Sequence, residues 1–227
     1  MIISHKHKFI FIKTHKTAGS SLEYMLSSIC GPDDIITPLI EDKNQDRVIG
    51  PQNFNIPFGQ YSITEWLTFI TKGKKAQFKN HDPAIKAKKY LSQKQWNSYF
   101  KFCFERNPYE KLISWYYWNS KRTGYDLNTF IRKRNHHLKN ERELYYINNT
   151  FALDKVYKYE KIPDALREIS SLLKLEQPLE LPEYRAKANV RKDRRPYYEV
   201  LTQDQIKYAE EVFAHIFDLC GYIKHGQ

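Results

Sequence analysis

The sequence has few cysteines and no long hydrophobic run, and both absences limit the class of protein. The three cysteines, Cys30, Cys103 and Cys220, lie far apart and form no C-x-x-C pair. An odd number at such spacing predicts neither a disulfide framework nor a zinc site, so we expect a reducing compartment. Residues 1–16 carry only a short apolar run broken by lysines, which predicts neither a signal peptide nor a membrane span. A cytoplasmic protein is therefore expected.

Acidic residues are scarce relative to basic ones. The chain has 37 Lys and Arg against 26 Asp and Glu, which gives a formal net charge of +11. Such a surface attracts polyanions, whether nucleic acid, anionic lipid or a multiply phosphorylated small molecule, and charge alone does not choose among them. Most of these basic side chains are expected to form a solvated surface. The arginines beside motifs are more informative.

Core-forming side chains are abundant. Hydrophobic residues make up 41% of the chain, with 17 Tyr and 13 Phe, a composition that excludes a disordered protein. With 227 residues and no internal repeat, the chain is expected to form one domain over residues 1–227.

Short apolar runs alternate with longer segments of helical period, as in parallel strands joined by crossover helices. Strands are predicted at 9–12, 99–105 and 155–160, each followed by a helix, and a last helix is predicted at 202–217. Residues 32–75 carry Gly, Pro, Asn and Asp and are interpreted as an irregular excursion over the sheet. The sequence therefore predicts a three-layer α/β fold of the P-loop type, with a central, mostly parallel sheet flanked by helices.

The first predicted strand leads into KTHKTAGSSLE, which has the outline of a phosphate-binding loop without its usual lysine. The nucleotide loop G-x-x-x-x-G-K-[ST] carries its lysine late, beside a metal-holding hydroxyl. Here Lys16 comes first, before Thr17, Gly19, Ser20 and Ser21. Unpaired N–H groups at a helix N-terminus bind anions, and Gly19 allows close approach. Lys16 is then placed to stabilise charge on a leaving oxygen.

The simpler alternative for this loop is a Gly-Ser-Ser turn in which Ser20 or Ser21 only caps the helix. A second motif, ERNPYEKLISWYYW, favours the functional interpretation. Arg106 follows a predicted strand and Ser114 lies about two helical turns later, so both are expected near the strand ends that hold the first loop. An arginine fork and a hydroxyl suit a second phosphate. The alternative is a surface arginine paired with Glu110.

These motifs resemble those of the sulfotransferase superfamily. KTHKTAGSSLE is similar to its 5′-phosphosulfate loop, and RNPYEKLISWYY is similar to its 3′-phosphate segment. More specifically, the chain resembles the carbohydrate sulfotransferases related to the heparan 2-O and chondroitin 4-O enzymes and their small bacterial relatives. KNHDPAIKAKKYL, VYKYEKIPDAL and the closing ANVRKDRRPYYEVLTQDQIKYAEEVFAHIFDLCGY extend the likeness over most of the chain.

The resemblance implies 3′-phosphoadenosine-5′-phosphosulfate (PAPS) as donor, 3′-phosphoadenosine 5′-phosphate (PAP) as product, no required metal, and a carbohydrate hydroxyl as acceptor. Arg106 and Ser114 would hold the 3′-phosphate, and Lys16 would steady the bridging oxygen as the sulfuryl group leaves. The 5′-phosphate loop would comprise Lys16, Thr17, Ala18, Gly19, Ser20 and Ser21.

The resemblance also assigns a base and a closing loop. His81, in KNHDPA, stands where the family carries its histidine base, and His15 beside the loop is the rival. Arg191, Lys192 and Arg195 are candidates for the 3′-phosphate or adenine side, although a solvated basic loop is the alternative for each. Val190 and Arg191 stand where a smaller polar residue is expected, so the individual contacts stay open.

Two other functions fit the sequence less well. A P-loop kinase of small molecules needs a late loop lysine and an acidic magnesium holder, and neither is evident; Glu105 and Glu160 end strands but are expected in ion pairs. A nucleic-acid binder would use the aromatic side chains of residues 115–118, but consecutive residues point around all sides of a helix, so core packing explains most of them and no nucleic-acid partner is expected. The acceptor stays open between a carbohydrate, a lipid-linked sugar and a small metabolite, with residues 32–75 and 125–146 expected to shape its pocket.

Overall fold

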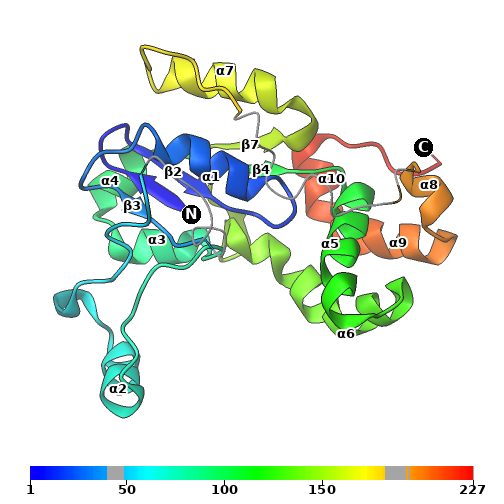
Figure 1. Cartoon of the computed structure of the whole chain (residues 1–227), viewed down its shortest axis with the longest axis horizontal. Coiled ribbons are helices and arrows are strands. Elements are labelled where there is room, and N and C mark those ends of the chain that lie inside the picture. Colours follow the sequence, from blue (N-terminus) through cyan, green and yellow to red (C-terminus); the bar gives the residue numbers. More distant parts are fainter. Residues whose placement is uncertain (40–48, 182–192, 194, 227) are drawn as a thin grey trace.

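A five-stranded sheet forms the centre of the molecule (Figure 1). The computed structural model describes residues 1–39, 49–181, 193 and 195–226. The strand order is β3-β1-β2-β4-β7, in which β2, β4 and β7 are parallel while β1 and β3 run antiparallel to their neighbours. The strands are β1 (Ile2–Ser4), β2 (Phe9–Ile12), β3 (Ile35–Ile36), β4 (Phe100–Glu105) and β7 (Lys155–Lys158).

This architecture confirms the predicted α/β class and refines it, because the sheet is mixed and only its core strands are parallel. Strand β1 was not predicted, because it is only three residues long and turns directly into β2. Lys8 in that turn has a φ of 55°. The predicted last helix is also divided, since α9 (Gln203–Val212) and α10 (Ala214–Cys220) are separated at Phe213.

The helices cover both faces of the sheet and form a separate group beside it. They are α1 (Gly19–Ser27), α2 (Ile63–Lys72), α3 (Ala84–Tyr90), α4 (Gln93–Ser98), α5 (Pro108–Thr123), α6 (Leu127–Lys139), α7 (Ile162–Leu172), α8 (Tyr197–Val200), α9 (Gln203–Val212) and α10 (Ala214–Cys220). Three 3-10 turns, η2 (Phe58–Gln60), η3 (Asn140–Leu144) and η4 (Tyr159–Lys161), and a small hairpin of β5 (Tyr146–Ile147) and β6 (Thr150–Phe151) complete the described elements.

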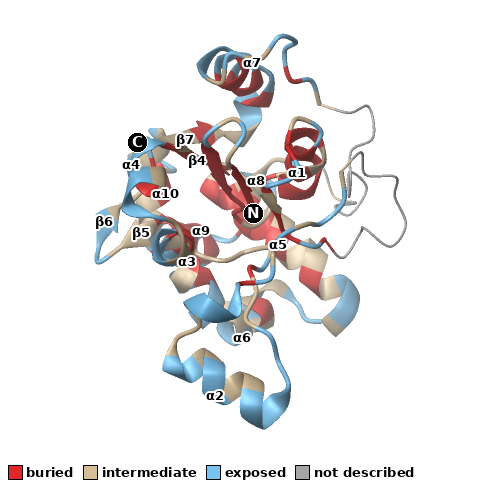
Figure 2. Cartoon of the chain, turned by 90° about the vertical axis from the view of Figure 1, so that its left-hand side faces the viewer, coloured by how far each residue is buried: buried red, intermediate tan, exposed pale blue. Residues whose placement is uncertain are grey.

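Alternation along the strands produces the layers. Phe9, Phe11 and Phe102 point to one face, where they pack with α1 and α7. Ile10 and Cys103 point to the other face, toward α3 and α4. Both sets are fully buried, as the red centre of Figure 2 shows. A third core joins α5, α6, α9 and α10. The carboxyl ends of the parallel strands lie beside the start of α5, which follows β4. In open α/β sheets, ligands bind at these carboxyl ends.

Residues 54–78 form a projecting arm, which the sequence analysis treated as part of an irregular excursion. Two extended segments pair at its base: the N–H of Phe78 donates to the carbonyl of Phe54, and that of Ile56 donates to the carbonyl of Ala76. Beyond this stem the arm carries η2 and α2, which extend away from the sheet (Figure 1). Helix α2 is well bounded, with a Ser62–Glu65 capping box and Gly73 in the left-handed region.

Candidate active site

The loop between β2 and α1 has the backbone of an anion-binding turn. Lys16 and Ala18 adopt positive φ angles of 65° and 58°. Ala18 is the N-cap of α1 and offers no side-chain cap, so the alternative in which Ser20 or Ser21 caps the helix is wrong. The first helical bond is donated by the N–H of Leu22 to the carbonyl of Ala18. The preceding N–H groups are left for a ligand, and the first turn contains no acidic residue.

Lys13 supports this loop from below and was not predicted. Its buried ammonium lies 2.6 Å from Oε2 of Glu23 and donates to Oγ of Ser20 at 3.3 Å. Burial alone would raise the pKa of Glu23, but the Met1 ammonium and Lys13 hold that pKa below its ordinary value. A Cβ at Gly19 would lie 2.7 Å from Cγ and Cε of Lys13, so any larger residue would force the buried Lys13 side chain to shift. In the sequence, nothing distinguished Lys13 from the lysines around it.

The two remaining polar residues of the loop entrance have different surroundings. Thr17 is buried, and its hydroxyl lies 3.0 Å from that of Thr14 and 3.3 Å from the Thr14 carbonyl. Lys16 extends over the ring of Trp118, with its ammonium 5.3 Å from the ring centroid. A cation held against an indole face keeps its charge at a fixed place beside the loop.

The two histidines that competed for the role of base lie against each other. The rings of His15 and His81 are stacked, with centroids 3.9 Å apart and planes 13° apart. Trp115 covers the other face of His15 at 4.6 Å. His15 therefore lies between His81 and Trp115, beside its rival for the role of base. Trp115 was interpreted as a core residue, and it both packs in the α5 core and positions His15.

Hydrogen bonding fixes the tautomer of His81. Its Nδ1 lies 2.9 Å from the backbone carbonyl of Lys13, which only accepts, so Nδ1 carries the proton and Nε2 carries the lone pair. Burial, followed by the charges of His15 and Lys13, lowers the pKa of His81 to about 2. The ring is thus held neutral, and among the described residues no partner occupies Nε2.

A buried charge network holds His15. Its backbone N–H and its Nδ1 contact the two carboxylate oxygens of Glu141 at 2.9 and 2.6 Å. Glu141 in turn pairs at 2.9 Å with Lys111, whose ammonium lies 2.6 Å from Glu105. All three ionic side chains are at most 1% exposed. Lys111 and His15 hold the pKa of Glu141 below its ordinary value against the effect of burial, whereas burial raises the pKa of Glu105 to about 7.

This network was missed, apart from the expectation that Glu105 forms an ion pair. Glu141 lies 126 residues after His15, and no local pattern connects the two. The other strand-end acid, Glu160, accepts hydrogen bonds from the Asn107 N–H at 2.9 Å and from the Tyr222 hydroxyl at 2.5 Å.

Arg106 and Ser114 lie on consecutive elements, as expected. Arg106 follows β4, and Ser114 is half-buried on α5. The guanidinium contacts Glu110 at 3.4 Å, as in the simpler alternative, and lies over the ring of Tyr159 at 4.6 Å. Its Nε, however, is buried with no hydrogen-bond partner among the described residues. A buried donor without a partner is costly, which favours a ligand at this position.

The closing basic loop falls partly outside the described residues, which exclude Arg191 and Lys192. Arg195 is described, and its side chain is 60% exposed. Its guanidinium forms a bidentate salt bridge with Asp193, with Nη2 2.7 Å from Oδ2. Tyr197, the first residue of α8, stacks its ring on that of Tyr109 with centroids 4.2 Å apart, and this contact attaches α8 to α5.

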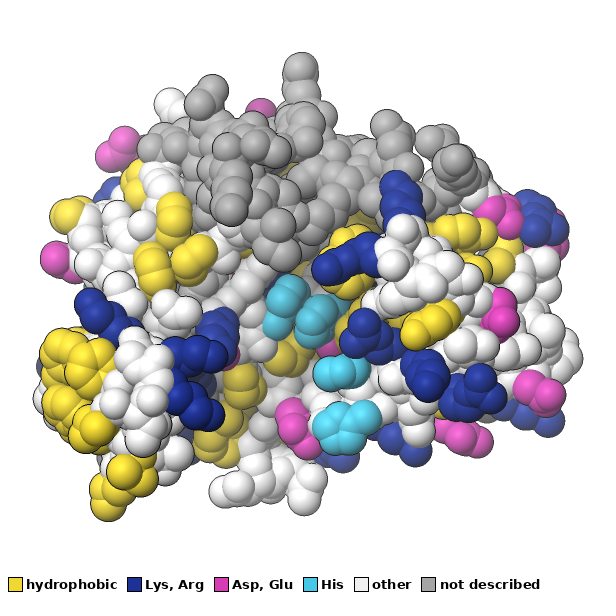
Figure 3. Space-filling view, turned by 60° about the horizontal axis from the view of Figure 1, so that its bottom comes forward, with side chains coloured by type: hydrophobic (Ala, Val, Ile, Leu, Met, Phe, Trp, Pro, Cys, Tyr) yellow, Lys and Arg dark blue, Asp and Glu magenta, His cyan; other side chains and the backbone are white. Residues whose placement is uncertain are grey.

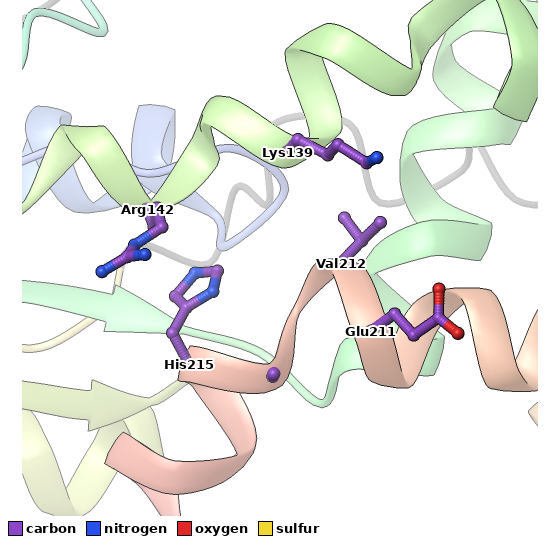
Figure 4. A pocket seen from close by; sticks show the side chains of 6 residues that line it. Lys139, Arg142, Glu211, Val212 and His215 are labelled. Atoms are coloured by element: carbon purple, nitrogen blue, oxygen red, sulfur yellow. The ribbon is translucent and has the colours of Figure 1, made fainter.

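One face of the molecule is rich in histidine and basic side chains. Figure 3 shows histidine side chains in the middle of this face, with Lys and Arg side chains on both sides. A separate cavity of about 340 Å³ lies between η3 and the junction of α9 and α10 (Figure 4). It is lined by Lys139, Arg142, Glu211, Val212, Ala214 and His215. None of these residues belongs to the predicted site.

Comparison with known proteins agrees with this geometry. The model of the sulfotransferase family matches residues 1–152, which include the loop, both histidines, Arg106, Ser114 and Glu141. The chain belongs to this family, which includes carbohydrate sulfotransferases, and it is a PAPS-dependent sulfotransferase. No curated protein and no solved structure gave a match. The kinase alternative is therefore rejected, and no helix in the described ranges is long and apolar enough to cross a membrane.

The residues present fit the donor that the family uses. The uncapped N-terminus of α1, with the positive-φ residues before it, suits a 5′-phosphate. Arg106, with its buried and unpartnered Nε, offers a second anion contact at the end of the neighbouring parallel strand. Two separate anion positions match a donor that carries a 3′-phosphate as well as a 5′-phosphosulfate.

Proposed function

We propose that this sulfotransferase modifies a hydroxyl group of a carbohydrate, with His81 as general base and Lys16 as the stabiliser of the leaving group. The observation that carries the proposal is the hydrogen bond from His81 Nδ1 to the Lys13 carbonyl. It leaves Nε2 as a proton acceptor beside the phosphate loop, because Lys13 immediately precedes that loop. PAPS, when bound, supplies the sulfuryl group.

Residues of the loop between β2 and α1 would bind the 5′-phosphate and shape the turn. The N–H groups of Gly19, Ser20 and Ser21 bind the 5′-phosphate together with the Ser20 and Ser21 hydroxyls. The remaining loop members, Thr17 and Ala18, shape the turn: the Thr17 hydroxyl bonds within the loop and the Ala18 backbone has a positive φ.

Charged groups at the two ends of the donor complete the site. The Lys16 ammonium, fixed over Trp118, stabilises negative charge as it develops on the bridging oxygen. Arg106 and Ser114 bind the 3′-phosphate, and Arg191, Lys192 and Arg195 bind the 3′-phosphate or the adenine side. No metal is needed in this scheme, because the positive charge comes from side chains and backbone dipoles.

Neutral His81 is suited to its role. A histidine accepts the hydroxyl proton only when its ring is unprotonated, and burial maintains that state across the physiological pH range. The stacked ring of His15 keeps His81 in place, and Glu141 keeps His15 in place. His15 is therefore assigned a positioning role in this proposal.

The acceptor is proposed to be an anionic carbohydrate. Exposed basic side chains of α6, including Arg132, Lys133 and Lys139, and Lys88 of α3 suit carboxylate or sulfate groups on a glycan. Cys30, Cys103 and Cys220, all among the described residues, form no disulfide with one another, which supports a reducing compartment, and we propose the cytoplasm.

Two experiments test the proposal. Calorimetric titration with PAP and with ATP, each with magnesium and with chelator, is expected to show metal-independent binding of PAP and weak binding of ATP. Transfer of labelled sulfuryl from PAPS is then measured with acidic and neutral polysaccharides of matched length. Label in the acidic polysaccharides that is lost in the His81→Gln variant supports the proposal. Label only in small metabolites, or transfer by His81→Gln at the normal rate, contradicts it.

A further inference from the structure

The arm of residues 54–78 presents an apolar row to solvent. Ile63, Leu67 and Ile70 are 80, 57 and 74% exposed. Residues three and four apart share one face of an α-helix, so these side chains form a continuous strip along the ten residues of α2. Scattered exposed apolar residues are ordinary on protein surfaces, but a continuous strip on a projecting helix marks a contact surface.

This row is not needed to fold the arm. The arm has its own aromatic cluster on another side of α2, made by Phe58, Tyr61, Trp66 and Phe69, with centroids 5.1 Å apart between Phe58 and Phe69 and 5.6 Å apart between Phe58 and Trp66. The capping box of α2 and its glycine end give the helix defined limits. Phe58 and Trp66 are themselves 46 and 40% exposed and extend the apolar surface.

Basic residues border the row, and acidic residues do not. Lys72 ends α2, and Lys74 and Lys75 follow it, all exposed. The one acidic residue between positions 54 and 78 is Glu65. Its carboxylate is turned toward the body, where it accepts hydrogen bonds from Ser62, Lys89 and Tyr90. Figure 3 shows hydrophobic side chains gathered at the end of the face that holds the arm, with Lys and Arg side chains beside them.

An apolar strip with a lysine border matches the surface of an anionic bilayer. Helices that lie in the membrane interface carry apolar residues and Trp on one side and Lys or Arg around them. A second copy of the chain matches less well. A stable protein interface takes about 800 Å² from each partner, whereas a ten-residue helix is only about 15 Å long.

We propose that the α2 arm docks on anionic lipid membranes, with Ile63, Leu67 and Ile70 inserted among the headgroups and Lys72, Lys74 and Lys75 on lipid phosphates. The surface lies on the arm alone and uses no residue of the donor or base site. The inference therefore stands independently of the proposed acceptor and of the catalytic assignments.

Vesicle flotation tests this docking with the full chain. Wild type is mixed with vesicles of phosphatidylglycerol and phosphatidylcholine, or of phosphatidylcholine alone. We expect flotation with the anionic vesicles, at least about tenfold weaker for Ile63→Ser/Ile70→Ser because two inserted side chains are lost. The matched control is Leu172→Ser/Ile223→Ser, which removes two exposed apolar side chains outside the arm, 52 and 73% exposed, and is expected to float like wild type.

The lysines are tested separately. Lys72→Gln/Lys74→Gln/Lys75→Gln is expected to weaken flotation on anionic vesicles and to reduce its dependence on salt. Circular dichroism and PAP titration verify that each variant is folded and retains its donor site. Failure of wild type to float with anionic vesicles overturns the proposal, as does equal loss in the matched control. Sedimentation showing a dimer that Ile63→Ser/Ile70→Ser dissociates, without vesicle binding, would instead assign the row to a second copy.

Discussion

The imidazole rings of His15 and His81 stack face to face, with their centroids 3.9 Å apart. Each ring has one nitrogen fixed by a different acceptor: His15 Nδ1 contacts the Glu141 carboxylate, and His81 Nδ1 donates to the Lys13 carbonyl. Protonating both rings at this distance would place two positive charges in contact. The pair is therefore asymmetric, with the carboxylate on the side of His15 and the neutral base on the side of His81.

This asymmetry predicts different effects of the two histidines on turnover. His81→Gln keeps a donor for the Lys13 carbonyl but has no proton acceptor, so kcat is expected to fall by about 10²–10⁴ with unchanged affinity for PAP. His5→Gln, a change at the opposite end of the strands, serves as control. If His15→Gln abolishes transfer while His81→Gln does not, the roles of the two histidines are reversed.

The buried neutral His81 also predicts a dependence of stability on pH. The folded pKa of about 2 lies below the unfolded value of 6.5, so between these values the unfolded chain binds a proton that the folded chain does not. The free energy of unfolding should therefore fall as pH drops below 6.5. His81→Gln should remove about 1–2 kcal/mol of the loss between pH 7 and pH 5. Urea unfolding at both pH values measures this change in the free energy of unfolding. An identical change between pH 7 and pH 5 in the wild type and in His81→Gln would contradict the buried neutral state.

Lys111 is predicted to stabilise the fold because its ammonium lies between two buried carboxylates. Lys111→Met leaves Glu105 and Glu141 without their shared cation, and the free energy of unfolding should fall by about 3–5 kcal/mol. The matched control is Lys155→Met, which breaks an exposed pair with Glu168 and should cost less than about 1 kcal/mol. Equal losses in denaturant unfolding would show that the buried network does not stabilise the fold.

Arg106 is predicted to recognise the 3′-phosphate. Arg106→Ala should weaken binding of PAP by about 1.5–3 kcal/mol, the range for hydrogen bonds to charged groups, and leave adenosine 5′-phosphate unaffected. Calorimetry with both ligands gives the comparison, with Arg167→Ala on α7 as control. The same loss for both ligands would show that Arg106 does not distinguish the 3′ group.

Local sequence patterns predicted the parts of the fold and site that depend on neighbouring residues. The continuous run at Phe9–Ile12 and the Gly-Ser-Ser turn placed β2, the loop and α1 correctly, because burial on both faces and helix N-terminal geometry are local properties. The helix after Asn107 was placed for the same reason, with Pro108 in its first turn.

Contacts between distant segments could not be predicted in this way. Glu141 meets His15 across 126 positions, and Glu23 meets Lys13 under the loop only because α1 folds back on β2. The αL conformation of Ala18 was also unexpected, since alanine has no intrinsic preference for it; the loop imposes it. The helical arm was missed because its stem depends on pairing between residues 54–56 and 76–78.

Substitution of Lys16 is predicted to lower the rate of sulfuryl transfer without lowering the affinity for the donor product. Lys16→Met keeps an unbranched side chain, one atom shorter than lysine, and removes the charge over Trp118, while the positive φ of the backbone is equally strained in both proteins. Because charge on the bridging oxygen develops during transfer, kcat should fall by about 10²–10³ while affinity for PAP changes little. Single-turnover rates with labelled PAPS and calorimetry with PAP measure the two quantities. A proportional loss of single-turnover rate and of affinity for PAP would make Lys16 a donor-binding residue. Another group would then have to stabilise the charge on the leaving oxygen.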